Sequence, residues 1–166
     1  MTFAGNIGSA QSVETIIYAA EILKDENIRF NLVGDGSKIE DCQKLVEEKG
    51  LTNVIFHGRK PVEEMPEIYK NSTAMLITLT ADPSISKTLP GKVQTYMAAG
   101  KPILGAVDGE TAQTILSAEC GFVAPSEDYE KFAECIKEFL NSDRQKLGEN
   151  SYKYYTEYFS KDVFVE

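Results

Sequence analysis

Small residues follow a short strand-like run near the start of the sequence, in the turn Gly5-Asn6-Ile7-Gly8. Glycine lets a ligand approach free backbone N–H groups, and a following helix would add the favourable end of its dipole. Gly5, Asn6 and Gly8 are therefore candidate contacts for a phosphate. Glycines that serve only the backbone angles of a strand-to-helix turn explain the pattern equally well.

The stretch from Lys87 to Lys92 precedes a helical pattern, with Thr88 as a candidate cap and Pro90 in the expected first turn. A cation in a first turn opposes the helix dipole, so Lys92 suits a bound anion better than it suits the helix itself. Lys92 is the preferred single phosphate contact. The alternative is an ordinary solvated lysine.

Two further loops carry candidate residues. Gly34-Asp35-Gly36 follows the second strand-like run, but Ile39 stands where a dinucleotide fingerprint has its third glycine, which argues against an NAD site. Arg59 and Lys60 follow the third run and could contact a base edge or a phosphate, because arginine offers a planar fork of donors. Simple loop exposure explains these two equally well.

No residue stands out as catalytic. The single histidine, His57, has no cysteine or serine partner at a motif spacing, so a structural role is preferred. The sequence contains no nucleophile elbow, Walker loop or zinc-protease motif. Acidic pairs such as Glu47-Glu48 fall on expected helices and indicate solvated faces. A metal site is not expected either.

The elements that must position these loops alternate between strand and helix. Strands are expected at residues 2–4, 29–33, 54–57, 74–79, 102–106 and 121–123, and helices at residues 13–23, 39–49, 63–70, 90–99, 110–118, 128–141 and 143–158. Strict alternation predicts an α/β fold, a Rossmann-like, doubly wound parallel sheet of about six strands with helices on both faces. Ligands bind such sheets beyond the carboxyl ends of the strands, which is where the candidate loops lie.

Bulk composition narrows the function. The 166 residues carry a formal charge of -9, a field that repels nucleic-acid phosphates and anionic lipids. Three scattered cysteines suit a reducing compartment, and neither a secretory leader nor a long apolar run is visible. We expect one cytoplasmic domain over residues 1–166 that does not bind nucleic acid.

The order of these segments resembles the carboxy-terminal domain of family 4 (group 1) glycosyltransferases with the GT-B fold, particularly bacterial enzymes of lipopolysaccharide and capsule synthesis. The resemblance covers nearly the whole chain. Its carriers are Phe3 to Gly8 with Gln11, Leu32 to Gly36, Val54 to Arg59, and Leu89 to Pro102. The last is the most specific, and four motifs in the right order at the right strand ends are stronger than any one.

The resemblance implies that the chain is the half that binds a nucleotide diphospho-sugar, UDP-sugar in preference to GDP-sugar, as substrate and without a cofactor or bound metal. It implies diphosphate contacts from the first glycine turn and Lys92, and base or ribose contacts from the third loop and the start of the later helix. The donor-binding residues are then Gly5, Asn6, Gly8, Gly34, Gly36, Arg59, Lys60, Lys87, Pro90, Gly91, Lys92, Gln94 and Thr95. The catalytic residues are not identified.

One departure concerns two glutamates that many relatives carry eight positions apart before the Met-Ala-x-Gly-x-Pro segment. Lys87 and Thr95 occupy the matching positions here, so the usual ribose-binding carboxylate is absent. The chain resembles a subgroup of amino-sugar or fucosamine transferases with a Pro-x-Lys pattern.

The resemblance also implies a missing partner. The chain looks like an excised second half, with residues 143–166 as the terminal helix and the tail that crosses back toward an absent acceptor-binding domain. The full enzyme would transfer sugar to a glycan or lipid-linked acceptor, with peripheral contact at the inner membrane face left open, while this half alone would be inactive. Two alternatives remain at this point: half of a sugar-nucleotide epimerase and a non-enzymatic small-molecule-binding Rossmann-like module.

Overall fold

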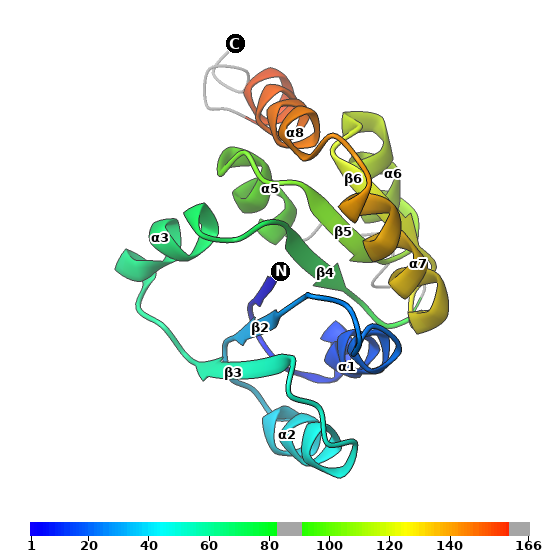
Figure 1. Cartoon of the computed structure of the whole chain (residues 1–166). Helices are drawn as coiled ribbons and strands as arrows, with labels where there is room; N and C mark the ends of the chain where they lie inside the picture. The colour runs from blue at the N-terminus through cyan, green and yellow to red at the C-terminus, as the bar shows by residue number, and fades with distance from the viewer. Residues whose placement is uncertain (83–90, 160–166) are drawn as a thin grey trace.

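The computed structural model describes residues 1–82 and 91–159 and shows one central parallel sheet (Figure 1). Its strands pair in the order β3-β2-β1-β4-β5-β6, all in parallel. They are β1 (Thr2–Ala4), β2 (Phe30–Val33), β3 (Val54–Gly58), β4 (Met75–Thr78), β5 (Ile103–Ala106) and β6 (Gly121–Ala124). The order reverses between β1 and β4, which defines the switch point of a doubly wound sheet.

Helices follow the strands as the sequence predicts. They are α1 (Val13–Ile22), α2 (Ile39–Glu48), α3 (Met65–Lys70), α5 (Gly91–Ala98), α6 (Gly109–Ala118), α7 (Tyr129–Leu140) and α8 (Arg144–Tyr158). The last two helices, α7 and α8, each begin directly after an aspartate whose side chain caps the helix. Asp128 accepts a hydrogen bond from the backbone N–H of Lys131, and Asp143 from that of Lys146, at 3.1 Å each.

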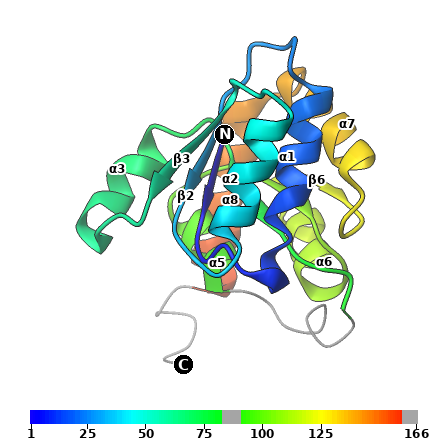
Figure 2. The ribbon, with the colours of Figure 1, turned by 90° about the horizontal axis from the view of Figure 1, so that it is seen from below.

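The helices cover both faces of the sheet. Helices α1, α2 and α7 lie side by side on one face (Figure 2), over a core that includes Phe30, Leu32 and Leu76. Helices α3, α5 and α6 contribute to the core on the opposite face, where Met75 and Ile77 point. Neighbouring strand residues thus enter different cores, the pattern of a strand buried on both sides. The doubly wound, Rossmann-like prediction is confirmed.

Two local expectations need correction. The first glycine turn does not open α1 directly, because fully buried Ile7 draws the chain into the core and a 3-10 turn, η1 (Ser9–Gln11), intervenes. Ser12 then adopts a left-handed conformation with φ 46° before α1 begins. The expected helix over residues 63–70 starts as another 3-10 turn, η2 (Val62–Glu64), since Pro66 is tolerated only within the first turn of α3.

Candidate functional site

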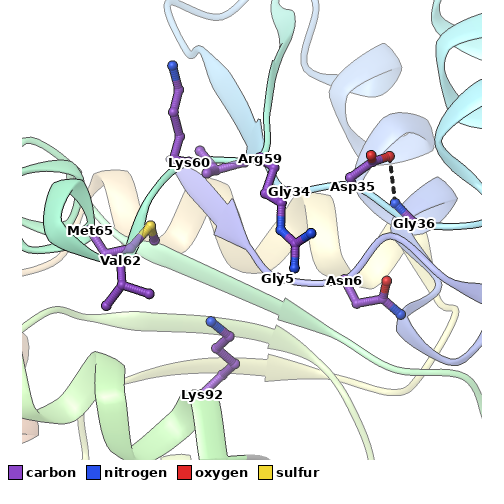
Figure 3. Close-up of a pocket in the computed structure, with 11 residues that line it drawn as sticks. Gly5, Asn6, Gly34, Asp35, Gly36, Arg59, Lys60, Val62, Met65 and Lys92 are labelled. Carbon is purple, nitrogen blue, oxygen red and sulfur yellow. Dashed lines mark hydrogen bonds between the residues drawn. The ribbon is translucent and has the colours of Figure 1, made fainter.

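A cavity of about 580 Å³ opens beyond the carboxyl ends of β1, β2 and β3, beside the switch point (Figure 3). We call it the glycine-loop cavity. It is lined by Gly5, Asn6, Val33, Gly34, Asp35, Gly36, Arg59, Lys60, Val62, Met65 and Lys92. Seven of the residues predicted from the sequence to bind a ligand therefore lie around one space: Gly5, Asn6, Gly34, Gly36, Arg59, Lys60 and Lys92.

The two glycine loops form one wall by packing backbone against backbone. A Cβ on Gly34 would clash with the carbonyl oxygen of Gly5, and one on Gly36 would lie 2.5 Å from the carbonyl oxygen of Ile7. The Ile7 N–H donates to the Asp35 carbonyl at 2.9 Å, and the Lys38 N–H donates to the Ile7 carbonyl at 2.9 Å. Gly34 and Gly36 thus have a structural reason to be glycine, and their contact with a ligand stays a prediction.

Most backbone donors of the first glycine turn are already engaged. The Gly5 N–H donates to the Val33 carbonyl at 3.0 Å, and the N–H of buried Gly8 donates to the Gln11 side-chain oxygen at 3.1 Å. Within the described ranges, the Asn6 N–H makes no hydrogen bond. The Asn6 N–H is therefore the backbone donor of this turn that remains available to a ligand. The predicted phosphate contact of the turn through backbone N–H groups is thus limited to Asn6.

Basic side chains reach the cavity from two sides. Arg59 comes from the loop after β3 and Lys92 from the first turn of α5, and both point toward the space beside Gly5 (Figure 3). The Lys92 stem passes close to Gly5, since a Cβ there would lie 3.6 Å from the Lys92 Cε. No ion pair among the described residues involves either cation, so an anionic ligand would supply the missing counter-charge.

Helix α5 places Lys92 through its buried face. Val93, Tyr96 and Met97 are almost completely buried, and the Tyr96 hydroxyl donates a 2.9 Å hydrogen bond to the Ala4 carbonyl. That carbonyl belongs to the last residue of β1, directly before Gly5. Burial is the main cause that raises the pKa of Tyr96, and the neighbouring Tyr69 adds to the rise, while the hydrogen bond to Ala4 acts in the opposite direction. The hydroxyl therefore keeps its proton and remains a donor.

The Lys60 side chain is oriented differently from that of Arg59. It extends away from the other labelled groups (Figure 3) and also lines a neighbouring hollow of about 200 Å³. His57 lines that hollow too, where its Nε2 lies 2.8 Å from the Asn31 side-chain oxygen. The histidine therefore lies outside the glycine-loop cavity and has a polar partner of its own.

Several predicted residues do not line the cavity. Gly8, Gly91 and Gln94 are absent from its wall, and Thr95 lines a separate hollow with Tyr69 and turns its hydroxyl back to the Gly91 carbonyl at 3.2 Å. Lys87 and Pro90 lie outside the described residues. The roles assigned to these positions stay predictions.

Four lining residues were missed from the sequence: Val33, Asp35, Val62 and Met65. Val62 is 81% exposed although it is a large aliphatic residue, and with Met65 it gives the cavity an apolar wall. Its position two residues after Lys60 was the available signal. The Asp35 carboxylate accepts from the Gly36 N–H at 2.8 Å. Among the described residues no cluster of three or more acidic, histidine or cysteine side chains could hold a metal ion.

Fold and cavity together define an α/β protein with a cation-lined cavity at the switch point of a doubly wound sheet. The chain belongs to the glycosyl transferases of group 1, whose family model matches residues 1–154. The resemblance drawn from the sequence motifs is thereby confirmed.

Named relatives agree with this assignment. The probable glycosyltransferase WbjE of Pseudomonas aeruginosa is 29% identical over 169 residues, which cover 98% of this chain and 42% of that protein. The putative colanic acid biosynthesis glycosyl transferase WcaI of Escherichia coli K12 is 30% identical over 98 residues, 59% of this chain and 24% of that protein. This chain thus spans less than half the length of these relatives.

Solved structures agree on the fold. Anabaena Alr3699/HepE, crystallised in complex with UDP, superposes with a TM-score of 0.84 at 16% identity, covering 99% of this chain and 45% of that one. WaaG, a glycosyltransferase involved in lipopolysaccharide biosynthesis, gives 0.78 at 22% identity, covering 98% and 43%. No helix in the described part of this chain is long and apolar enough to cross a membrane.

Proposed function

We propose that this chain holds the diphosphate of a nucleotide-activated sugar in the glycine-loop cavity. The observation that carries the proposal is the pair of cations, Arg59 and Lys92, which line the same cavity as Asn6 and have no ion-pair partner within residues 1–82 and 91–159. A diphosphate supplies the charge that this arrangement lacks. Val62 and Met65 offer an apolar surface beside it for the base or the sugar.

The chain would serve as the donor-binding half of a retaining glycosyltransferase that acts in cell-surface polysaccharide synthesis. Support comes from family membership and from relatives named for colanic acid biosynthesis. UDP-sugar is the proposed donor because Alr3699/HepE binds UDP on the same fold. The three free cysteines favour a cytoplasmic location, and contact with the inner membrane face belongs to the proposed full enzyme.

Epimerisation is not favoured. It needs acid and base groups at the sugar, and the described residues around the cavity offer only Asp35 as a carboxylate and no histidine. His57 lies in the neighbouring hollow against Asn31. A non-enzymatic binding module is not favoured either, because the family and the named relatives are transferases.

The test is a calorimetric titration of the chain with UDP, GDP, ADP and NAD, each with and without magnesium. We expect saturable binding of UDP, weaker binding of GDP and no dependence on magnesium, since the side chains themselves offset the diphosphate charge. Binding of NAD alone, a requirement for magnesium, or no binding of any nucleotide would contradict the proposal.

Sugar transfer by the chain alone should be absent or very slow. Transfer requires donor and acceptor to be held together, and the chain spans only 42% of WbjE. The measurement is release of UDP from UDP-sugars in the presence of glycan acceptors. Robust turnover by the chain would show that it needs no second half.

A further inference from the structure

Two carboxylates join the three loops that follow β4, β5 and β6. Asp108 Oδ1 accepts a hydrogen bond from the Ser126 N–H at 3.1 Å, which links the loop after β5 to the loop after β6. Glu127 Oε2 accepts from the Ala81 N–H at 2.9 Å and links the loop after β6 to the loop after β4. The first bond links loops that follow neighbouring strands, whereas the second links the loops of β4 and β6 across β5, which lies between them in the sheet.

The backbone of Glu127 is unusual. Its φ of 65° lies in the left-handed region, which glycine adopts freely and which costs energy for a residue with a side chain. The side chain at this position nevertheless reaches across to Ala81. A strained residue whose side chain makes a specific contact suggests that the contact matters to the protein.

The segment held by Glu127 leads to the glycine-loop cavity. The Thr80 N–H donates to the Ala10 carbonyl at 3.0 Å, and the Thr78 hydroxyl donates to the Gln11 carbonyl, so the end of β4 holds the 3-10 turn η1. The Gln11 side-chain oxygen in turn accepts from the Gly8 N–H at 3.1 Å and from the Asn6 side-chain nitrogen at 3.4 Å. Glu127 is therefore connected to Asn6 by hydrogen bonds and by the short backbone segments between them.

We propose that Glu127 is a positioning residue for the nucleotide diphosphate. Its carboxylate fixes Ala81, and through residues 78–80 it fixes η1 and the glycine turn that contains Asn6, a residue that lines the cavity. The inference rests on the proposed donor-binding function. It adds a residue far along the chain that is not among the described residues lining the cavity.

Three variants separate this role from simple turn geometry. Glu127→Gly relieves the strained backbone and removes the acceptor, whereas Glu127→Gln retains a side-chain oxygen. Glu119→Gly is the matched control, because Glu119 is also an exposed glutamate at positive φ, 53°, and its side chain makes no hydrogen bond among the described residues. All three are made in the 166-residue chain, and the melting temperature shows whether each is folded.

Two measurements follow: backbone hydrogen exchange of the free chain and calorimetric titration with UDP. In Glu127→Gly we expect faster exchange at Ala81 and Gly8 and UDP binding weakened about three- to tenfold, the effect of one exposed charge-assisted hydrogen bond. Its melting temperature should not fall. Glu127→Gln should stay within about twofold of the unmodified chain, because it keeps an acceptor, and Glu119→Gly should change neither measurement.

The outcomes distinguish the two proposals. If the unmodified chain binds UDP and Glu127→Gly binds it equally well, the positioning role is overturned while donor binding stands. Faster exchange at Ala81 without any change at Gly8 would also overturn it, since the bond would then be only local. If no nucleotide binds, donor binding fails, and the exchange at Gly8 still decides whether Glu127 orders the glycine turn.

Discussion

Lys92 lies in the first turn of α5, exposed, where its charge opposes the helix dipole and has no carboxylate partner among the described residues. Lys92→Ala should weaken UDP binding about five- to thirtyfold, the loss of one charge-assisted contact to a phosphate. The same change should leave the free chain as stable as before or slightly more stable. Calorimetry and thermal unfolding provide the two measurements.

Lys44→Ala is the matched control for this change. Lys44 is an exposed lysine on α2, away from the glycine-loop cavity, so its removal alters the net charge equally. Equal weakening of UDP binding by both substitutions would mean that only the overall charge matters, and Lys92 would lose its assigned role.

Tyr96 connects α5 to the end of β1 through a single buried hydrogen bond. Tyr96→Phe removes the donor and leaves the Ala4 carbonyl without it, so the free energy of unfolding should fall by about 1–2 kcal/mol. Urea denaturation measures the loss. Tyr69→Phe is the control, because the Tyr69 ring packs edge-on to Tyr96 at 5.9 Å but its hydroxyl makes no hydrogen bond among the described residues. Similar losses in both variants would contradict this account.

At the scale of elements, the glycine-loop cavity depends on two loops that approach more closely than side chains allow. Gly34→Ala would push a Cβ into the Gly5 carbonyl at a φ of 139°, so we expect a loss of about 2 kcal/mol or more in the free energy of unfolding. A Cβ on Gly91, at the start of α5, would enter open space, so Gly91→Ala should change the free energy of unfolding by less than about 0.5 kcal/mol. Denaturant midpoints compare the two, and a Gly34→Ala chain of normal stability would refute the packing argument.

The order and type of the elements could be predicted because each local pattern agrees with the fold. Alternating strands and helices dictated the doubly wound sheet, and caps such as Asp128 and Asp143 fixed helix starts to within a residue. The detour through η1 could not be predicted, since it depends on the burial of Ile7 by residues distant in sequence.

The site was predictable to the level of loops but not of every side chain. Arg59, Lys92 and the glycine loops were found because their types and strand-end positions carry a physical meaning. Thr95 was predicted with Lys92 as a donor-binding residue, yet it lines the hollow beside Tyr69. Their positions in the sequence do not reveal this difference, because the packing of α3 beside α5 decides which cavity each face of α5 meets.

At the scale of the whole molecule, the charge around the glycine-loop cavity is opposite in sign to the net charge of the chain. The chain carries a net charge of -9, which disfavours the approach of any anion. Arg59, Lys60 and Lys92 nevertheless gather at the carboxyl edge, where the glycine loops lie. The sheet therefore brings together cations from positions far apart in the sequence, and they line one cavity on an acidic protein.

The whole fold should lose stability in alkaline solution through its three thiols. Desolvation by burial, the largest cause in each, raises the pKa of Cys42, Cys120 and Cys135 from near 9 to about 11. The unfolded chain then releases thiol protons before the folded chain does. The contribution of the protonated thiols to the free energy of unfolding is therefore fully present below pH 9 and is lost as the pH rises from 9 toward 11.

By pH 10 the buried thiol of Cys120 alone should lower the free energy of unfolding by about 1 kcal/mol, with further losses from Cys42 and Cys135. Urea denaturation at pH 8, 9 and 10 measures the slope. Replacing all three cysteines by alanine should flatten it in this range, and the remaining decline above pH 10 should reflect Tyr69 and Tyr96, whose pKa values burial also raises. An unchanged slope in the triple variant would mean that the thiols do not control the alkaline limit of the fold.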